Sequence, residues 1–326
     1  MLNYNLTAEA TNLLFSFAVY TVQGVFGLCI NLLLFFVVVW HEALRDRKEF
    51  LLMAGLALAD AMCYGLTNIA LGLYRIPRVL DSSYLEPTGR INCFLTVGQS
   101  SFFINYTASC LMLLVVSFDR FLAVQWPLGY LGLSRWYAFS ILSTVFSLSL
   151  LEYVVIGLRS WYSGDIVTKL CWSSESAVRL DYNLQARQNT FFVLSSLAMY
   201  GLALISYRKS LKRVIDSHQS DSSEGKSLMW QKSFTRAVGF SCLMTFCFLV
   251  LPIMLQNILA NLWPKLHYRF GGWVWLVNSF NSMANLAVYV NKQKDVKKGF
   301  WAMLRGKKMP PMLNQWQTVS ARSVNG

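Results

Sequence analysis

Charged side chains are scarce in this chain. Asp, Glu, Lys and Arg make up 14% of its 326 residues, whereas hydrophobic residues make up 55%. A soluble domain usually carries about 25% charged residues. A chain this long and this apolar would be insoluble as a globule, so its uncharged runs predict membrane spans. The net charge of +13 is then expected to differ between the two sides of a membrane, and no nucleic-acid partner is expected.

Residues that could build a metal or catalytic centre are also few. The three histidines, His41, His218 and His267, lie in connectors or at the edges of apolar runs, so we predict no enzyme. The seven cysteines include no Cys-x-x-Cys pair and no Cys/His cluster, which argues against structural zinc. The chain lacks the pattern of a signal peptide, so its first apolar run is expected to be a retained span.

Seven apolar runs are long enough to cross a hydrocarbon core of roughly 30 Å, which needs about 20 helical residues. They lie near residues 13–40, 50–74, 94–124, 137–158, 188–210, 235–262 and 272–290. In lipid only helices and closed barrels satisfy the backbone, and these runs lack the alternation of barrel strands. The sequence therefore predicts an all-α membrane protein with a seven-transmembrane helix bundle over 13–290. A secondary transporter is the less favoured alternative, because no paired repeats are evident.

Lysine and arginine are divided unevenly between the connectors. They are more frequent after the first, third and fifth runs and in the tail, which places these segments in the cytoplasm. The N-terminal segment 1–12 is then extracellular, consistent with the glycosylation sequon that begins at Asn5. Cys93 and Cys171 lie in two connectors on the same outer side. An isolated pair there predicts a single disulfide.

The end of the chain has two parts. Residues 291–305 combine lysines with apolar residues at helical spacing, among them Val296, Phe300 and Trp301. This pattern predicts a short amphipathic eighth helix on the inner leaflet, with its lysines near anionic lipid. Residues 306–326 are expected to form a disordered cytoplasmic tail, and the polar stretch 212–231 a flexible inner loop.

Five polar residues interrupt the apolar runs: Asp60, Ser109, Asn281, Ser282 and Asn285. A polar side chain in hydrocarbon is costly, so it usually faces the interior and has a function. In a helix bundle these five can meet at one depth. One carboxylate with several neutral oxygens suits a sodium ion or a proton. A hydrogen-bond network between the helices, with no ion, is the alternative.

Short motifs occur in a characteristic order along the runs. They are Asn31 in the first run, Leu56 to Asp60 in the second, Ser117 to Val124 in the third, Pro252 in the sixth and Asn285 to Tyr289 in the seventh. Together they resemble the motifs of rhodopsin-like, or class A, G-protein-coupled receptors, and the resemblance covers residues 14–305. It implies a receptor in the plasma membrane that binds an extracellular ligand and activates a heterotrimeric G protein. The five interior polar residues match the group that holds sodium in this family, and we expect no cofactor besides that ion.

The resemblance also assigns a switch at the inner end of the third helix. Arg120 would be held by Asp119 at rest and released on activation toward Tyr200 or Tyr289 and the partner protein. The alternative is an interfacial ion pair that only anchors the helix end, a contact worth about 0–1 kcal/mol.

Two departures from the family leave open whether activation uses the usual switch. Val250 replaces the tryptophan of the sixth helix, and Leu286 replaces the proline of the NPxxY motif. The stretch from Tyr289 to Phe300 is similar to the seventh-helix exit of odorant receptors. Residues 55–75 look like those of nematode serpentine chemoreceptors. These similarities favour a chemosensory receptor.

Aromatic residues dominate the expected ligand cavity. The candidate lining residues are Phe102, Phe103, Tyr106, Asn257 and Trp275, with Trp172 as a cap from the loop beside Cys171. An aromatic set with few polar groups suits a small apolar or neutral molecule. Ordinary helix packing is the alternative for each of these residues. A peptide-ligand or orphan receptor of the same family also stays open.

Overall fold

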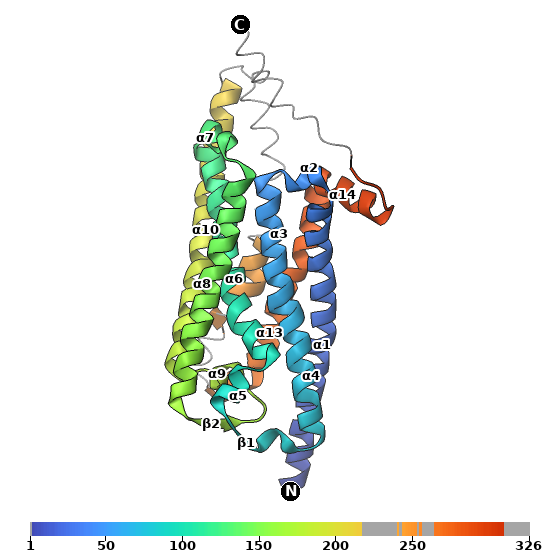
Figure 1. Ribbon diagram of the computed structural model, residues 1–326, viewed down its shortest axis with the longest axis vertical. Helices are drawn as coiled ribbons and strands as arrows, with labels where there is room; N and C mark the ends of the chain where they lie inside the picture. The colour runs from blue at the N-terminus through green and yellow to red at the C-terminus, as the bar shows by residue number, and fades with distance from the viewer. Residues whose placement is uncertain (1, 217–239, 241–242, 253, 256–263, 310–326) are drawn as a thin grey trace.

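The protein is a bundle of long helices packed side by side (Figure 1). The computed structural model describes residues 2–216, 240, 243–252, 254–255 and 264–309. The long helices are α1 (Leu2–Trp40), α3 (Lys48–Asp60), α4 (Thr67–Leu80), α6 (Val97–Gln125), α8 (Arg135–Ser163), α10 (Arg179–Asp216) and α13 (Pro264–Lys292). The π-helical turn η1 (Ala61–Leu66) joins α3 to α4 in one continuous span.

Five stretches within the described residues are long and apolar enough to cross a membrane. They are Ala10–Trp40, Lys48–Leu80, Val97–Gln125, Arg135–Ser163 and Arg179–Lys209. They correspond to the first five predicted runs, and α13 covers the seventh. The predicted sixth run, 235–262, lies partly outside the described residues, and the part that is described includes the π-helical turn η3 (Phe246–Val250). The expectation of an all-α membrane protein is confirmed.

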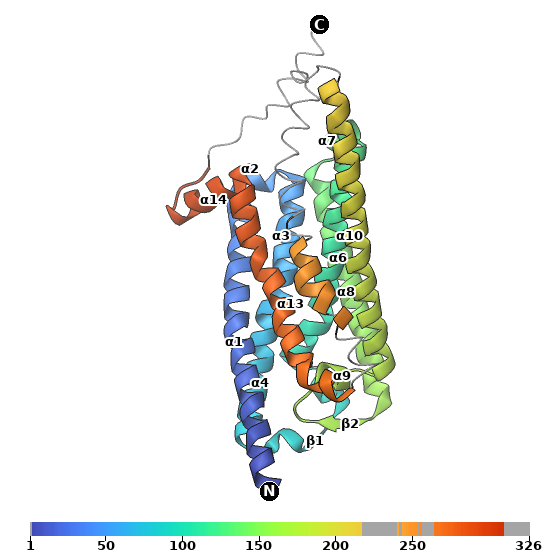
Figure 2. The ribbon, with the colours of Figure 1, turned by 180° about the vertical axis from the view of Figure 1, so that it is seen from behind.

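The connectors gather at the two ends of the bundle. Helices α2 (Glu42–Arg45) and α7 (Pro127–Gly132) lie at one end, with α14 (Lys294–Leu304). The turn η2 (Ser83–Leu85), strands β1 (Pro87–Gly89) and β2 (Ile166–Thr168), and helices α5 (Arg90–Phe94) and α9 (Ser173–Ser176) lie at the end that holds the N-terminus. Figure 2 shows α13 alongside α1, with α14 projecting sideways from the bundle.

The expected disulfide is present between Cys93 and Cys171, whose Cα atoms are 5.2 Å apart. It joins α5 to the connector that follows β2. The two strands pair antiparallel, with Thr88 opposite Val167. The disulfide and the strand pair therefore fix the long connector between α8 and α10 against the start of α6.

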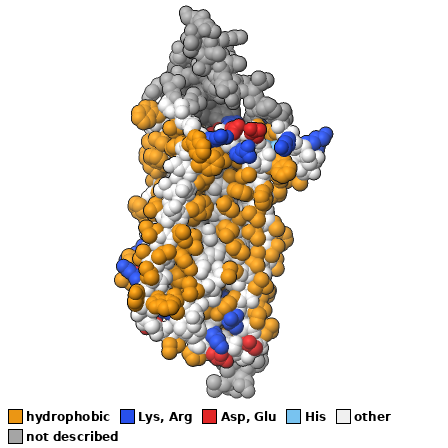
Figure 3. Space-filling model, viewed as in Figure 1, with side chains coloured by type: hydrophobic (Ala, Val, Ile, Leu, Met, Phe, Trp, Pro, Cys, Tyr) orange, Lys and Arg blue, Asp and Glu red, His pale blue; other side chains and the backbone are white. Residues whose placement is uncertain are grey.

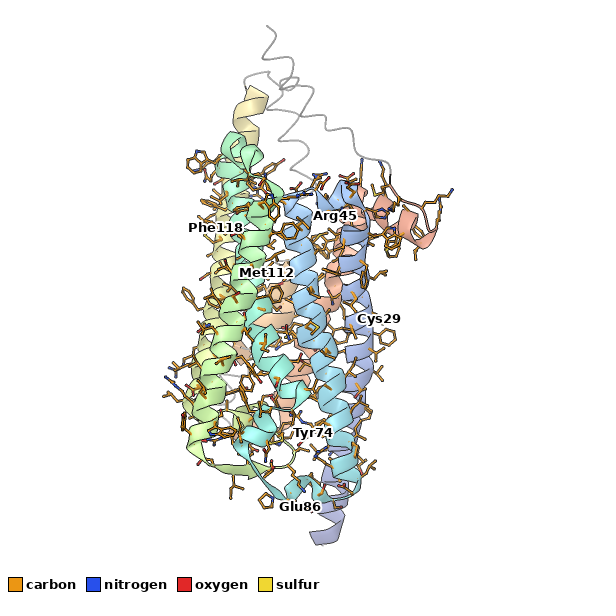
Figure 4. The ribbon with its side chains drawn as sticks, viewed as in Figure 1. Cys29, Arg45, Tyr74, Glu86, Met112 and Phe118 are labelled. Atoms are coloured by element: carbon orange, nitrogen blue, oxygen red, sulfur yellow. A yellow bond between two sulfur atoms is a disulfide. The ribbon has the colours of Figure 1, made fainter. Side chains whose placement is uncertain are left out.

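Large apolar side chains cover the flank of the bundle (Figure 3). Phe26, Leu151 and Phe191 are each at least 60% exposed. In Figure 4, Phe118 and Cys29 point away from the helices, whereas Arg45 and Glu86 mark the two charged ends. A flank this apolar would aggregate in water. An apolar flank between charged ends is what a lipid bilayer requires of a membrane protein.

Two boundaries differ from the sequence-based expectation. Helix α1 begins at Leu2, so it includes most of segment 1–12, which was expected to precede the first span. The eighth helix begins at Lys294 rather than at residue 291, because α13 continues to Lys292. Helix α10 also continues through residues 212–216 of the expected inner loop, and residues 306–309 of the expected disordered tail form a hydrogen-bonded turn. Residues 310–326 of the tail and 217–231 of the loop lie outside the described residues.

Glycines allow α1 and the η1 turn to approach closely. A Cβ atom at Gly65 would lie 2.7 Å from the Cα atom of Leu28, and one at Gly24 would lie 2.9 Å from the carbonyl oxygen of Gly65. Helices in lipid associate largely through van der Waals packing, so small residues are favoured where backbones meet. This contact holds the second span against the first, and with it the segment that carries Asp60.

We predict that Gly65→Ala destabilises the protein by about 1–3 kcal/mol, because the added methyl group collides with the backbone of α1. The midpoint of thermal unfolding of the purified protein in detergent measures the effect. Gly201→Ala is the matched control. Nothing lies within 4 Å of a Cβ atom there, and alanine is favoured over glycine in a helix by about 0.5–1 kcal/mol. Equal midpoints for the two variants would contradict the close packing.

Candidate functional site

A polar group from four spans lies in the middle of the bundle. The Ser109 hydroxyl on α6 donates to Oδ1 of Asp60 at the end of α3, over 2.5 Å. Both side chains are buried. Asn281 on α13 lines the same small cavity, and its amide oxygen accepts a hydrogen bond from the Thr245 hydroxyl at 3.0 Å. Asp60, Ser109 and Asn281, which the sequence predicted to meet, therefore do so.

The other two predicted members differ from this group. The hydroxyl of Ser282 accepts a hydrogen bond from Nδ2 of Asn31 at 2.8 Å, which ties α13 to α1 beside the cavity. The side chain of Asn285 lies outside the described residues, although its backbone belongs to α13. Thr245 was not predicted. Its signal in the sequence was a hydroxyl inside the sixth apolar run.

The cavity has oxygen ligands and room for one small particle. Its volume of about 10 Å³ accommodates about one water molecule. Its lining residues supply one carboxylate, three hydroxyl groups and one amide, from Asp60, Tyr64, Ser109, Thr245 and Asn281. Hard cations prefer such oxygen ligands. The geometry can therefore hold a sodium ion, or a proton on the carboxylate.

A second polar group closes the end of α6. Nη2 of Arg120 donates to the carboxylate of Asp119 and, over 2.8 Å, to the hydroxyl of Tyr130. The same hydroxyl donates to Oδ2 of Asp119 over 3.0 Å. All three side chains are buried. The arginine is thus enclosed by a carboxylate and a phenol rather than exposed at an interface. We refer to Asp119, Arg120 and Tyr130 as the inner latch.

Tyr130 lies on α7 and was not predicted as a site residue. Nζ of Lys48 holds α7 in place by donating to the carbonyl oxygens of Tyr130 and Leu133, the latter at 2.8 Å. The ammonium group also lies 4.1 Å from the centroid of the Tyr130 ring. Burial raises the pKa of Tyr130 well above the usual range of a phenol, so its hydroxyl stays protonated and can donate. A tyrosine in a short connector gave no pattern that separates it from a surface residue.

The predicted partners of a released Arg120 lie together. Tyr200 on α10 and Tyr289 on α13 are both buried in one apolar cluster, which also contains Leu34 and Val288. Arg120 itself donates to Asp119 and Tyr130. The contact between Arg120 and Asp119 is common to the predicted switch and to the alternative, an ion pair that only anchors the helix end.

The aromatic residues predicted for the ligand cavity fall into two clusters. Phe102 and Phe103 pack with Phe94, and the ring centroids of Phe102 and Tyr106 lie 5.4 Å apart. Trp172 instead packs against Phe17 in a different cluster, with ring centroids 6.0 Å apart. Asn257 lies outside the described residues, and only the backbone of Trp275 is described. The structure thus groups Phe102, Phe103 and Tyr106 but separates Trp172 from them.

A buried arginine anchors the connector that carries Trp172. Nε of Arg75 donates to the carbonyl oxygen of Leu170 at 3.0 Å, and Nη2 to that of Cys171 at 2.7 Å. The guanidinium carbon lies 4.9 Å from the centroid of the Trp172 ring. Nε2 of Gln99 donates to the same carbonyl oxygen of Cys171. The connector is thereby fixed over the end of the bundle. The sequence signal was an arginine at the end of an apolar run.

These features define a class of protein. A multi-pass membrane receptor has this combination: apolar helices across a membrane, a disulfide-linked connector at one end and a buried carboxylate–arginine pair at the other. The family model of the 7 transmembrane receptor (rhodopsin family) matches residues 30–289. The chain belongs to this family. It is therefore a signalling receptor and not an enzyme. A comparison with curated proteins gives no match.

We predict that Tyr130→Phe lowers the free energy of unfolding by about 1–3 kcal/mol, because a buried carboxylate loses a hydrogen-bond donor. Thermal unfolding of the purified receptor measures the loss. Tyr162→Phe removes the same hydroxyl at a position that is 84% exposed, so this control should unfold like the wild type. A Tyr130→Phe variant as stable as the control would show that the phenol contributes nothing to the inner latch.

Proposed function

We propose that the protein is a plasma-membrane receptor that binds an extracellular small molecule and activates a heterotrimeric G protein. The observation that carries this proposal is the inner latch. Arg120 keeps its charge at any physiological pH and presents a planar set of donors. While Asp119 and Tyr130 hold it, those donors are unavailable to a partner protein. Their release would expose a binding determinant at the inner end.

The orientation follows from chemistry at the two ends. Disulfides persist in oxidising compartments, which favours an extracellular location for Cys93, Cys171 and the N-terminal end. Lys48, Arg120 and the lysines of α14 belong to the opposite end, and excess lysine and arginine favours the cytoplasm. Glycosylation at Asn5, whose side chain lies outside the described residues, belongs to the same proposal.

Ligand and G protein would act on one equilibrium between two states. Helix α6 runs from the disulfide end to the inner latch, and its 29 residues span about 43 Å. A ligand at the outer end favours the released state only if it binds that state better than the latched one. Because α6 carries both Phe102 and Arg120, a small movement of this helix is felt at both sites.

The outer end supports a small, largely apolar ligand. Phe102, Phe103 and Tyr106 form an aromatic cluster on α6, and Arg75 holds Trp172 in a second cluster at the same end of the bundle. Apolar pockets with few polar groups are typical of small-molecule sites. We also propose that the receptor is chemosensory, because residues 55–75 and 289–300 are similar to segments of chemoreceptors.

We expect Asp119→Asn to raise basal G-protein activation, because the neutral side chain no longer holds Arg120 in the latched state. A loss of about 1–2 kcal/mol would shift the equilibrium roughly five- to thirty-fold. Nucleotide exchange on a panel of G proteins, measured without ligand and normalised to surface expression, reports the change.

Arg120→Ala should abolish both basal and ligand-stimulated exchange in the same assay. Asp46→Asn is the matched control, because Asp46 pairs with Arg135 in an ion pair whose side chains are about half exposed. Unchanged basal activity in Asp119→Asn, or full signalling by Arg120→Ala, would remove the proposed role of the inner latch.

The central cavity is proposed to hold a sodium ion in the latched state. A bound ion raises the free energy of unfolding by RT ln(1 + [L]/Kd), where [L] is the concentration of the free ion. The wild-type receptor should therefore unfold at a higher temperature in sodium chloride than in choline chloride of equal ionic strength. Asp60→Asn should lose this difference, and Glu42→Gln, which removes an exposed carboxylate, should keep it. Equal sodium responses in Asp60→Asn and the wild type would leave a hydrogen-bond network without an ion.

A further inference from the structure

An open groove of about 730 Å³ lies between α14 and the turn that follows it. Six cationic side chains line the groove: Lys294, Lys297, Lys298, Arg305, Lys307 and Lys308. The remaining lining residues are Asp295, Trp301, Ala302 and Met309. The geometry points to a binding site for the headgroup of an anionic phospholipid that carries more than one phosphate.

The turn after α14 builds the groove. Gly306 has a φ angle of 63°, which glycine adopts without the strain that a side chain would cause. The backbone N–H of Gly306 donates to the carbonyl oxygen of Met303, and that of Lys307 donates to the carbonyl oxygen of Ala302. These two bonds are the Schellman motif that ends many helices. The chain therefore turns back, and Lys307 and Lys308 come to face the same groove as the lysines of α14.

The groove is fixed to the bundle by a buried histidine. Nε2 of His41 lies 2.9 Å from the carbonyl oxygen of Gly299, and the backbone N–H of Met309 donates to its Nδ1 over 3.2 Å. Val296 is fully buried against the cluster that contains Leu44. The helix and the turn after it are thus both held against the end of α1, so the cations are arranged before any ligand arrives.

The charge of the groove is uncompensated within the described part of the chain. Its one carboxylate, Asp295, is in an ion pair with Arg47 at 3.1 Å. None of the six cations forms an ion pair with a described residue. Each lysine or arginine near an anionic membrane surface contributes to binding, and the contribution falls off within about 10 Å at 0.1 M salt. A compact ligand with several phosphates can meet more of these charges at once than lipids with one charge each.

Two exposed apolar side chains on α14 favour a lipid over a soluble phosphate. Trp301, which lines the groove, is 49% exposed, and Leu304 is 57% exposed. Trp301 thus adjoins the lysines of α14, as apolar side chains do on helices that lie in the membrane interface. The acyl chains of a lipid can then extend along Trp301 and Leu304 while the headgroup occupies the groove.

The test uses the full-length receptor in neutral detergent and native mass spectrometry, which measures the fraction of receptor that retains added phosphatidylinositol 4,5-bisphosphate. The wild type should retain this lipid in preference to phosphatidylserine added at equal total charge. Lys307→Gln with Lys308→Gln should weaken retention about tenfold. The control, Arg208→Gln with Lys209→Gln, removes the same charge from exposed positions at the end of α10 and should change retention less than twofold.

A third variant separates geometry from charge. Gly306→Val keeps every lysine but strains the turn, so it should weaken retention several-fold. Equal losses in the two double variants, equal retention of phosphatidylserine, or full retention by Gly306→Val would each overturn the site. Full displacement of the lipid by an equimolar amount of soluble inositol trisphosphate would overturn its assignment to a lipid. Because no G protein is present, these results are independent of the proposed signalling function.

Discussion

A polar side chain placed in hydrocarbon must find its partner on another helix, and this constraint organises the interior of the receptor. Asp60 is met by Ser109, Asn31 by Ser282 and Asn281 by Thr245. Each pair joins two different spans. In lipid the hydrophobic effect does not draw helices together, so hydrogen bonds and close packing decide which faces meet. The polar residues thus supply both the specificity of the bundle and the chemistry at its centre.

At the end of α6, buried polar groups find their partners within one helix and in the connector that follows it. Asp119 and Arg120 are adjacent in sequence, and a buried ion pair is costly to desolvate. The structure adds a third group, the hydroxyl of Tyr130, which bonds to both. Tyr130 in turn depends on Lys48, which holds the backbone of α7. The connector between α6 and α8 is therefore part of the latch, and a partner that moves this connector would also move the arginine.

The sequence was most informative where residue type alone carries meaning. Asp60 and Asn281 were found because polar groups in apolar runs are rare, and the disulfide because Cys93 and Cys171 stood apart from the apolar cysteines. Partners that depend on helix rotation were not predictable. Ser282 faces Asn31 rather than the cavity, and Trp172 joins Phe17 rather than Phe102. Tyr130 was not predicted as a site residue, because a short connector has no hydrophobic periodicity that would mark a buried position.

The π-helical turn η1 affects how the second span aligns with the second helix of related receptors. Such a turn bonds each residue to the fifth one along, so it accommodates an extra residue and changes the rotational phase of the helix that follows. Asp60 precedes the turn and Arg75 follows it, yet both are buried. Aligning this span without a gap to a receptor whose second helix is regular would therefore be correct up to Asp60 and shifted by one position afterwards. Arg75 would then be paired with a position about 100° away around the helix, and its equivalents in related receptors would be misidentified.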